Sequence, residues 1–361
     1  MRNNTWDARR MIELLKQLVA TPSFSRQEDA TADIIESVLR AAGRPVMRLG
    51  NNVVSIPPAN GRPRWLLNSH HDTVRPGGGW THDPLTPTVI DGRLYGLGSN
   101  DAGGPLVMML AAYLHMSETP DTPVQFAFAA TAEEEVSGDG GMDLLTREVF
   151  DKYPLACALV GEPTQMQLAV AERGLMVIDC TWHGRTGHAA RKEGINAIYA
   201  ALADIEWFRT YEFADTTGDL GEVSMTVTQI KAGTQHNVVP DVCTAVVDVR
   251  VPGSHTHEDV LAVIRAHVSC DCQPRSMRLR SSSIAMDHPL VQSGLTLGMQ
   301  AYASPTMSDQ ALLPSGVPSL KIGPGNSARS HTPDEWIGID EVESGIATFI
   351  HLLETTMRSL Q

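Results

Sequence analysis

The sequence of 361 residues lacks any apolar run that approaches the ~20 residues a helix needs to cross a bilayer. Residues 1–6 contain no apolar segment of the kind found in secretory signal peptides. We therefore expect a cytoplasmic protein with no membrane partner.

Basic residues are scarce: 28 Lys and Arg face 42 Asp and Glu, which gives a net charge of -14. A nucleic-acid partner requires a basic face, so this balance argues against one. The hydrophobic content of 42% and the charged content of 19% are typical of a globular protein. The length indicates about two domains.

Cysteine is also scarce. The five residues are odd in number and scattered along the chain, at Cys157, Cys180, Cys243, Cys270 and Cys272. Cys270 and Cys272 are separated by one residue, which is neither the spacing of a CxxC redox pair nor that of a zinc ribbon. We expect reduced thiols, as in other cytosolic proteins.

Apolar strand-like runs alternate with helical patterns in the first half of the chain. The runs lie at 64–68, 124–130 and 156–160, and the segments with helical periodicity include 6–19, before the first run, and 105–115, between the first and the second. This alternation predicts an α/β fold with a mixed sheet flanked by helices, whose ligands bind at the carboxyl ends of the strands. The segment 75–91 is rich in Gly, Pro and Thr and predicts a loop.

The pattern changes after Arg173. Strand-like and helix-like segments then follow in the order βαββαβ, at 175–183, 195–207, 222–231, 242–251, 257–267 and 275–280. This order is typical of a ferredoxin-like α+β domain. We therefore predict a catalytic α/β domain of residues 1–173 and 282–361, interrupted by an inserted domain of residues 174–281.

A histidine and an aspartate follow the apolar run at 65–67. Residues i and i+2 of a strand lie on one face, so His70 and Asp72 are expected to point one way and His71 the other. This arrangement suits an imidazole that binds a metal ion beside a carboxylate that orients it.

Further acidic and histidine residues supply groups that could bind metal. Together the candidates are His70, Asp72, Asp101, Glu134, Glu135, Glu162 and His331. Imidazole and carboxylate ligands suit zinc, or cobalt or manganese at a looser site. Five ligands are too many for one open tetrahedral site, so they predict two ions about 3.5–4 Å apart that share a carboxylate and a water.

A di-metal site of this kind also needs a base for the water. A carboxylate that is adjacent to a ligand, but not itself bound to metal, can accept the proton. Glu134 precedes Glu135 and fits this role, whereas Glu133 is expected to face away.

These residues resemble the motifs of a known family. The motifs are His70-x-Asp72-x-Val74, Gly96-Leu97-Gly98 with Asp101, Glu134-Glu135, Gly161-Glu162-Pro163-Thr164 and His331. The set is similar to the di-zinc aminoacylase and carboxypeptidase G superfamily of metallopeptidases, in sequence order and over essentially the whole chain. The resemblance implies a metal-dependent hydrolase of amide bonds.

The resemblance also implies individual roles. Two Zn2+ ions, for which Co2+ can substitute, are bound by His70 and Glu162 at one position, by Glu135 and His331 at the other, and by Asp101 at both. Glu134 is implied as the general base, and Asp72 as the carboxylate near His70. The family often has a cis peptide after the bridging aspartate, here between Asp101 and Ala102.

The inserted domain resembles the lid and dimerisation domain of the family. The segment 184–189 contains His188, which is implied to hydrogen-bond the developing oxyanion and, in dimeric members, to reach the partner subunit's site. Asn237 and Arg250 resemble substrate-binding residues, Arg250 as a bidentate clamp for a carboxylate. Without the resemblance, Asn237 is read as a strand-end cap and Arg250 as the partner in a surface ion pair.

One departure from the family pattern follows Asp101, where relatives commonly carry Met-Lys-Gly and this chain has Ala102-Gly103-Gly104. The missing lysine is not a ligand, so the predicted metal site is unaffected. Ser308 and Asp309 are expected to line the pocket.

The block at 94–101 and the segment around His70 most resemble the acetylornithine deacetylase branch. This resemblance implies removal of an acetyl or succinyl group from an amino acid of arginine biosynthesis, such as N-acetylornithine or N-acetylcitrulline. Succinyl-diaminopimelate and dipeptides are alternative substrates. A non-catalytic binding protein on the same fold is a further alternative, although the five ligand positions and the base are filled.

Overall fold

The computed structural model describes residues 7–119, 121–191, 193–214 and 221–361, and it divides into two compact units. The first unit comprises Met1–Val170, Ser283–Tyr302 and Ser308–Gln361, and the second comprises Ala171–Ser282 and Ala303–Met307. The predicted bounds, 1–173 and 282–361 for one domain and 174–281 for the other, differ from this division by a few residues at the junctions and at Ala303–Met307. The strands β8 (Leu168–Glu172) and β14 (Ala301–Ser304), which pair with each other, lie at these junctions.

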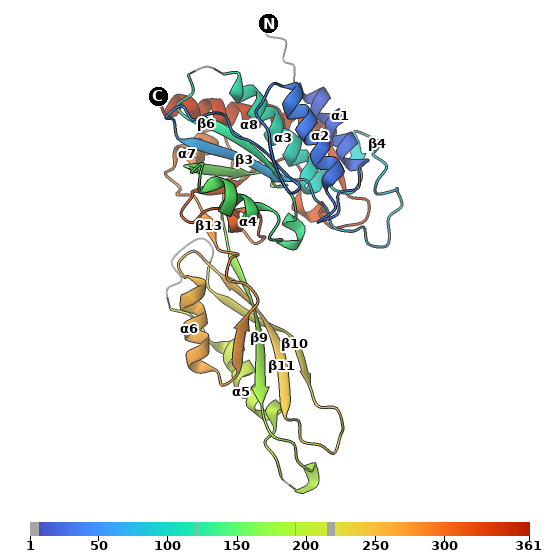
Figure 1. The fold of residues 1–361 in the computed structure, drawn as a ribbon, viewed down its shortest axis with the longest axis vertical. Helices are drawn as coiled ribbons and strands as arrows, with labels where there is room; N and C mark the ends of the chain where they lie inside the picture. The colour runs from blue at the N-terminus through green and yellow to red at the C-terminus, as the bar shows by residue number, and fades with distance from the viewer. Residues whose placement is uncertain (1–6, 120, 192, 215–220) are drawn as a thin grey trace. The chain divides into compact units, whose positions relative to one another are not determined.

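A nine-stranded mixed sheet forms the framework of the first unit (Figure 1). Its order is β1 (Met47–Leu49), β2 (Asn52–Ser55), β6 (Gln125–Thr131), β3 (Arg64–His70), β7 (Cys157–Val160), β15 (Ser319–Lys321), β8 and β13 (Ser282–Ser283), with β14 beside β8. The four central strands are parallel: β6 pairs with β3, β3 with β7, and β7 with β15. Their carboxyl ends therefore lie along one edge.

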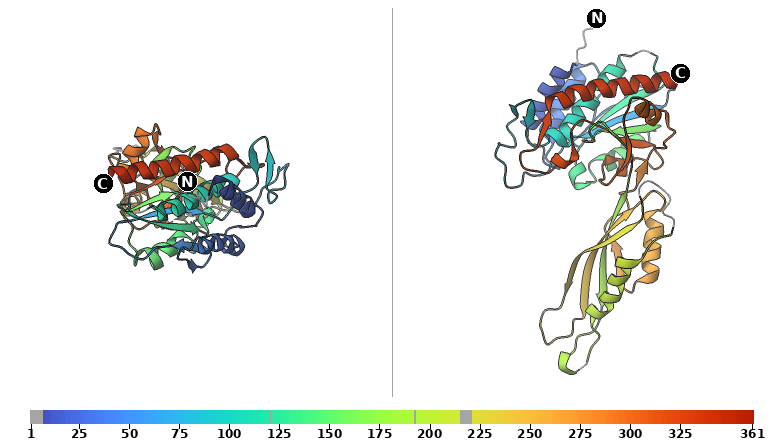
Figure 2. Two further views of the ribbon diagram at one scale, coloured as in Figure 1. Left: turned by 90° about the horizontal axis from the view of Figure 1, so that it is seen from above. Right: turned by 180° about the vertical axis from the view of Figure 1, so that it is seen from behind.

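Every residue of β3, β6 and β7 is buried, as expected for parallel strands covered on both faces. The helix α3 (Gly104–Ser117) packs on β3 and β6 and also contacts α1 (Ala8–Val19) and α8 (Ile339–Ser359). Because α3 is enclosed in this way, nearly all of its side chains are apolar and buried. Figure 2 shows α8 in red along the outside of this unit.

Shorter elements complete the first unit. They are α2 (Asp29–Ala41), α4 (Met142–Leu145), α7 (Pro289–Thr296) and a small sheet of β16 (Trp336–Gly338), β5 (Arg93–Tyr95) and β4 (Thr88–Ile90). The loop expected over 75–91 is thus wrong at its end, where β4 pairs with β5. The helix expected over 6–19 begins at Ala8, and Trp6 lies outside the described residues. Within the described chain, no helix is long and apolar enough to cross a membrane.

The second unit is a four-stranded antiparallel sheet with two helices. Its elements are β9 (Gly174–His183), α5 (Ala197–Thr210), β10 (Ser224–Ala232), β11 (Val242–Val251), α6 (His257–His267) and β12 (Asp271–Pro274). The sheet order β10-β11-β9-β12 gives the expected βαββαβ arrangement. The last strand was predicted at 275–280, but it ends at Pro274, which has no N–H group to extend the ladder.

The entry to α3 depends on glycine at position 103. A methyl group there would overlap the carbonyl oxygen of Gly98 and the side chain of Leu15. Since one of these atoms belongs to the backbone, G103A is expected to lower the free energy of unfolding by about 1–3 kcal/mol. Urea denaturation measures the change. The control is G78A, whose added methyl meets nothing within 4 Å; an equal effect of both substitutions would contradict the packing argument.

Candidate metal centre

Three neighbouring parallel strands deliver side chains to one edge of the first sheet. His70 is the last residue of β3 and pairs with Thr131, the last residue of β6. Glu134 and Glu135 follow β6, and Glu162 follows β7 by two residues. The carboxyl ends of adjacent parallel strands meet at the same edge, which explains why residues distant in sequence converge here.

Asp101 reaches the same edge from the turn of η1 (Ser99–Gly103), and the peptide bond between Asp101 and Ala102 is cis. Its Oδ1 atom lies 3.2 Å from Nε2 of His70, and that nitrogen lies 4.0 Å from Oε1 of Glu162. One ligand atom from each of His70, Asp101 and Glu162 therefore falls within a sphere that a single ion can fill.

A second group shares Asp101 but uses its other oxygen. Oδ2 of Asp101 lies 3.6 Å from Nε2 of His331, which lies 2.9 Å from Oε2 of Glu135. Each group offers one imidazole and two carboxylates, a donor set that fits a zinc ion with an open position. All five residues predicted as ligands thus lie together, and Asp101 occupies the central position.

The electrostatics of this edge are dominated by negative charge. Burial raises the pKa of Glu134 well above its usual value, and the charges of Glu162, Asp309 and Glu135 add to this. Burial and the charge of Asp101 raise the pKa of Glu162 to about 8. These carboxylates need a nearby positive charge in order to remain ionised at neutral pH.

The two imidazoles also have raised pKa values, which in their case favours the charged form. Burial opposes protonation of His70, but hydrogen bonds with Asp101 and Asp72 raise its pKa well above the usual value. The hydrogen bond to Glu135 raises the pKa of His331 to about 9. The site therefore favours bound cations, protons included, which fits a metal centre.

Asp72 has a wider structural role than its predicted contact with His70. Nδ1 of His70 lies 3.0 Å from the carbonyl oxygen of Asp72 and 3.4 Å from its carboxylate. The carboxylate accepts hydrogen bonds from the backbone N–H groups of Glu134 and Glu135, at 3.0 and 3.2 Å, and from Oγ of Ser25 at 2.7 Å. Asp72 thus fixes the backbone that carries the predicted base and one predicted ligand.

Glu335, which belongs to none of the predicted site residues, holds Asp101 in place. This buried carboxylate accepts hydrogen bonds from the backbone N–H groups of Asn100 and Asp101, both at 2.9 Å, and from that of Gly98 at 3.2 Å. Burial raises its pKa to about 8. Glu335 follows His331 by four residues and matches no motif, so only the fold reveals its contact with a turn more than 230 residues away.

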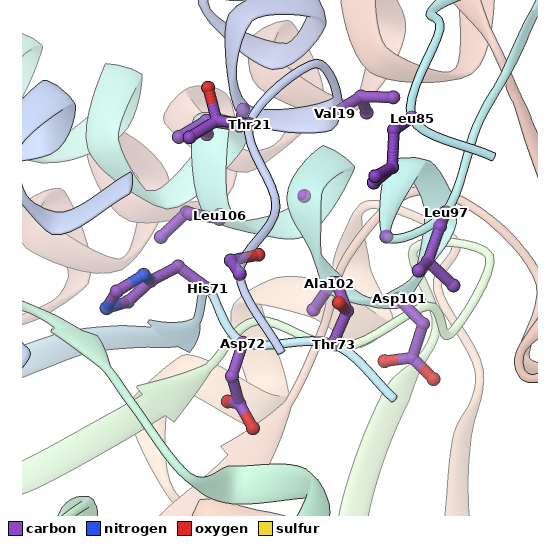
Figure 3. Close-up of a pocket in the computed structure, with 14 residues that line it drawn as sticks. Val19, Thr21, His71, Asp72, Thr73, Leu85, Leu97, Asp101, Ala102 and Leu106 are labelled. Carbon is purple, nitrogen blue, oxygen red and sulfur yellow. The ribbon is translucent and has the colours of Figure 1, made fainter. Parts of the chain in front are cut away.

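Neighbouring polar residues have structural partners. His71 is buried between Oγ1 of Thr31 and the carbonyl oxygen of Asn51, and burial lowers its pKa to about 4. Its ring points away from the carboxylates of Asp72 and Asp101, as Figure 3 shows. His71 is therefore a neutral structural residue, in agreement with the predicted alternation.

Two further acids near the site differ in environment. Oε2 of Glu133 lies 3.4 Å from Nε of Arg26, and Glu133 belongs to neither ligand group. Asp309 is buried, accepts a hydrogen bond from Oγ1 of Thr131, and has its pKa raised to about 6 by burial. Asp309 thus adds to the charge beside Glu134, whereas Ser308 caps the short helix that begins there.

The substrate-binding candidates all belong to the second unit. The segments of His188 and Asn237 are adjacent, since the N–H of Ala189 donates to the carbonyl oxygen of Asn237 at 3.1 Å. Arg250 makes a bidentate ion pair with Asp248, at 2.7 and 3.1 Å. This pair is the alternative considered for Arg250 in the sequence analysis, and the substrate roles of the three residues remain predictions.

The fold and the ligand groups together define a metal-dependent hydrolase with an α/β catalytic unit. Residues 66–355 match Peptidase family M20/M25/M40, and the chain belongs to this family. Acetylornithine deacetylase of Klebsiella pneumoniae (strain 342) is 28% identical over 359 residues, which cover 90% of this chain and 92% of that protein. The relatives confirm the expectation of a metal-dependent enzyme that hydrolyses amide bonds.

Solved structures share the fold. Aminopeptidase PepT from Bacillus cereus ATCC 10987 superposes with a TM-score of 0.76 at 19% identity, covering 97% of this chain and 99% of that one. The YXEP protein of Bacillus subtilis, described as a dinuclear metal-binding peptidase of the M20 family, gives a TM-score of 0.71 at 16% identity, with 96% and 97% covered.

Removing the carboxylate of Glu335 tests its hold on Asp101. E335Q places an amide NH2 against backbone donors, so Asp101 is expected to shift and metal affinity to fall about 10–100-fold. Competition with a chromophoric chelator measures the affinity. The control is E343Q, on the exposed side of α8. Wild-type affinity in E335Q would show that Asp101 is held by other contacts.

Proposed function

We propose that this enzyme removes an acetyl or succinyl group from the nitrogen of an amino acid of arginine biosynthesis, with N-acetylornithine or N-acetylcitrulline as the first candidates. Two relatives named acetylornithine deacetylase support the choice, at 28% and 26% identity over at least 90% of this chain. The observation that carries the chemistry is that two ligand groups share Asp101 beside the carboxylate of Glu134.

The metal centre is proposed to hold two zinc ions, for which cobalt can substitute. The ligands are His70 and Glu162 for one ion, Glu135 and His331 for the other, and Asp101 for both. When bound, such ions polarise the acyl carbonyl and lower the pKa of a water between them.

Glu134 is proposed to move the proton. Among the described residues, no side chain donates a hydrogen bond to its carboxylate, so the group is available to a water at the site. It accepts the proton as the water oxygen attacks the acyl carbon, and it then donates this proton to the amine nitrogen as the C–N bond breaks.

The second unit is proposed to complete the reaction. His188 stabilises the developing oxyanion, while Asn237 and Arg250 bind the substrate, Arg250 through its carboxylate. By resemblance, the protein forms a homodimer through this unit, and His188 acts within one chain or across the dimer.

Two other hydrolases are the alternatives. A succinyl-diaminopimelate desuccinylase differs only in the amino acid and the acyl group, and a dipeptidase differs in the leaving group. Peptidases are found among structures that share the fold at 15–19% identity, which supports no particular substrate. A non-catalytic binding protein is disfavoured because the five ligand positions and the base are filled.

The role of Glu134 is tested with E134Q. The amide cannot accept a proton, so turnover is expected to fall about 10²–10⁴-fold with both metals retained. Steady-state kinetics and metal analysis measure the two quantities. The matched control is E133Q, the adjacent acid, which should keep near-normal turnover. Substantial activity in E134Q would refute the assignment of the base.

The substrate is tested by kcat/KM over a panel. The panel holds N-acetylornithine, N-acetylcitrulline, N-succinylornithine, succinyl-diaminopimelate and simple dipeptides, each with the zinc- and the cobalt-loaded enzyme. We expect an acylated ornithine or citrulline to exceed the dipeptides at least about 100-fold, because misfit of a polar group at a buried site carries such a penalty. A flat profile would refute the arginine-pathway assignment.

A further inference from the structure

Three of the five cysteines converge in the second unit, although they are scattered in sequence. Cys180 on β9 is directly opposite Cys272 on β12, and opposed residues of an antiparallel pair point to the same face. Sγ of Cys270 lies 3.4 Å from Sγ of Cys272. All three Sγ atoms lie within 4.8 Å of one another.

The three thiols are enclosed by the second unit. Cys180 and Cys272 are buried, and Cys270 is half-buried. All three are free thiols. Cys243, also buried in this sheet, pairs in register with Trp182 and does not belong to the cluster.

A buried carboxylate fixes the turn that presents Cys270. Oδ2 of Asp204 accepts hydrogen bonds from Nε1 of Trp182 at 2.6 Å, from the N–H of Ser269 at 2.7 Å and from Oγ of Ser269 at 2.9 Å. Because Ser269 directly precedes Cys270, these bonds hold the third sulfur near the other two. The cluster is therefore preorganised rather than a chance contact of flexible side chains.

The three thiols share hydrogen bonds, which raise the pKa of Cys180 and lower that of Cys272. Hydrogen bonds with the thiols of Cys180 and Cys270 lower the pKa of Cys272, and the guanidinium of Arg265 acts in the same direction. Arg265 is anchored here, since its Nη2 donates to the carbonyl oxygen of Cys272 at 2.9 Å. Asp204 opposes this effect, but its Oδ2 is already engaged by three donors.

We propose that Cys180, Cys270 and Cys272 form a second metal site, which binds one thiophilic ion of the Cu+ class. Three sulfurs that each lie ~2.3 Å from one ion are about 4 Å apart, which the observed cluster can reach with small rotations. Each thiol loses its proton to solvent on binding, so the ion replaces the hydrogen bonds now shared among the sulfurs.

The number and type of ligands favour Cu+ over Zn2+. In the described part of the chain, no histidine or carboxylate joins the three sulfurs. Thiolates bind both Zn2+ and Cu+, but structural zinc sites are four-coordinate, whereas three sulfurs suffice for Cu+. An ion bound by the three sulfurs would link β12, through Cys272, and the turn before it, through Cys270, to Cys180 on β9.

The test is a Cu+ titration of the full-length protein with its catalytic metals in place, under anaerobic reducing conditions and against a chromophoric Cu+ chelator. We expect one Cu+ per chain, with ultraviolet thiolate-to-copper absorption. C180S and C272S are expected to weaken binding at least about 100-fold. The control C243S, in the same sheet, should change the affinity less than about 3-fold.

A measurement on the wild type alone covers the case in which a variant fails to fold. X-ray absorption at the copper edge should report three sulfur neighbours. Nitrogen or oxygen neighbours, equal affinity in C180S and the wild type, or tighter binding of Zn2+ than of Cu+ would overturn the proposal. None of these readouts depends on hydrolytic activity, so the result is independent of the proposed function.

Discussion

The accumulation of carboxylates at the carboxyl edge of β3, β6 and β7 is the constraint on which the first unit depends. Asp101, Glu134, Glu135 and Glu162 lie there with few compensating cations, and burial strengthens their mutual repulsion. An edge of this composition is stable when positive charge is bound between the carboxylates. The two imidazoles provide a part of it when protonated, and divalent cations can provide the rest.

The framework must hold these carboxylates close together although their charges repel one another. It does so through backbone hydrogen bonds to two further carboxylates. Asp72 binds the N–H groups of Glu134 and Glu135, and Glu335 binds those of Asn100 and Asp101. Because both contacts act on the main chain, the side chains of the site keep their acceptor oxygens free for cations. Each supporting carboxylate is remote in sequence from the backbone that it holds, by 62 and 63 residues for Asp72 and by 235 and 234 for Glu335.

The α/β sheet, and the convergence of the predicted ligands at one edge of it, could be predicted from the sequence because both rest on local patterns. Apolar runs mark β3, β6 and β7, and the parallel arrangement brings His70, Glu135 and Glu162 to one edge. Glu335 and the cysteine cluster have no such local signal, since their contacts span long sequence separations. The strand expected at 275–280 fails for a different reason: pairing with β9 occurs at Asp271–Pro274, a segment of four residues whose alternation is too short to predict a strand.

The two candidate sites of the chain differ in ligand chemistry, and this difference separates their ions. Oxygen and imidazole donors at the sheet edge suit Zn2+ or Co2+, whereas the three sulfurs of the second unit suit a soft monovalent ion. The affinity order that ranks Cu2+ above Zn2+ at nitrogen and oxygen sites concerns divalent ions and does not extend to Cu+. A thiolate cluster of the proposed kind would select Cu+ by the softness of its sulfurs and would leave Asp101 and its neighbours to divalent ions.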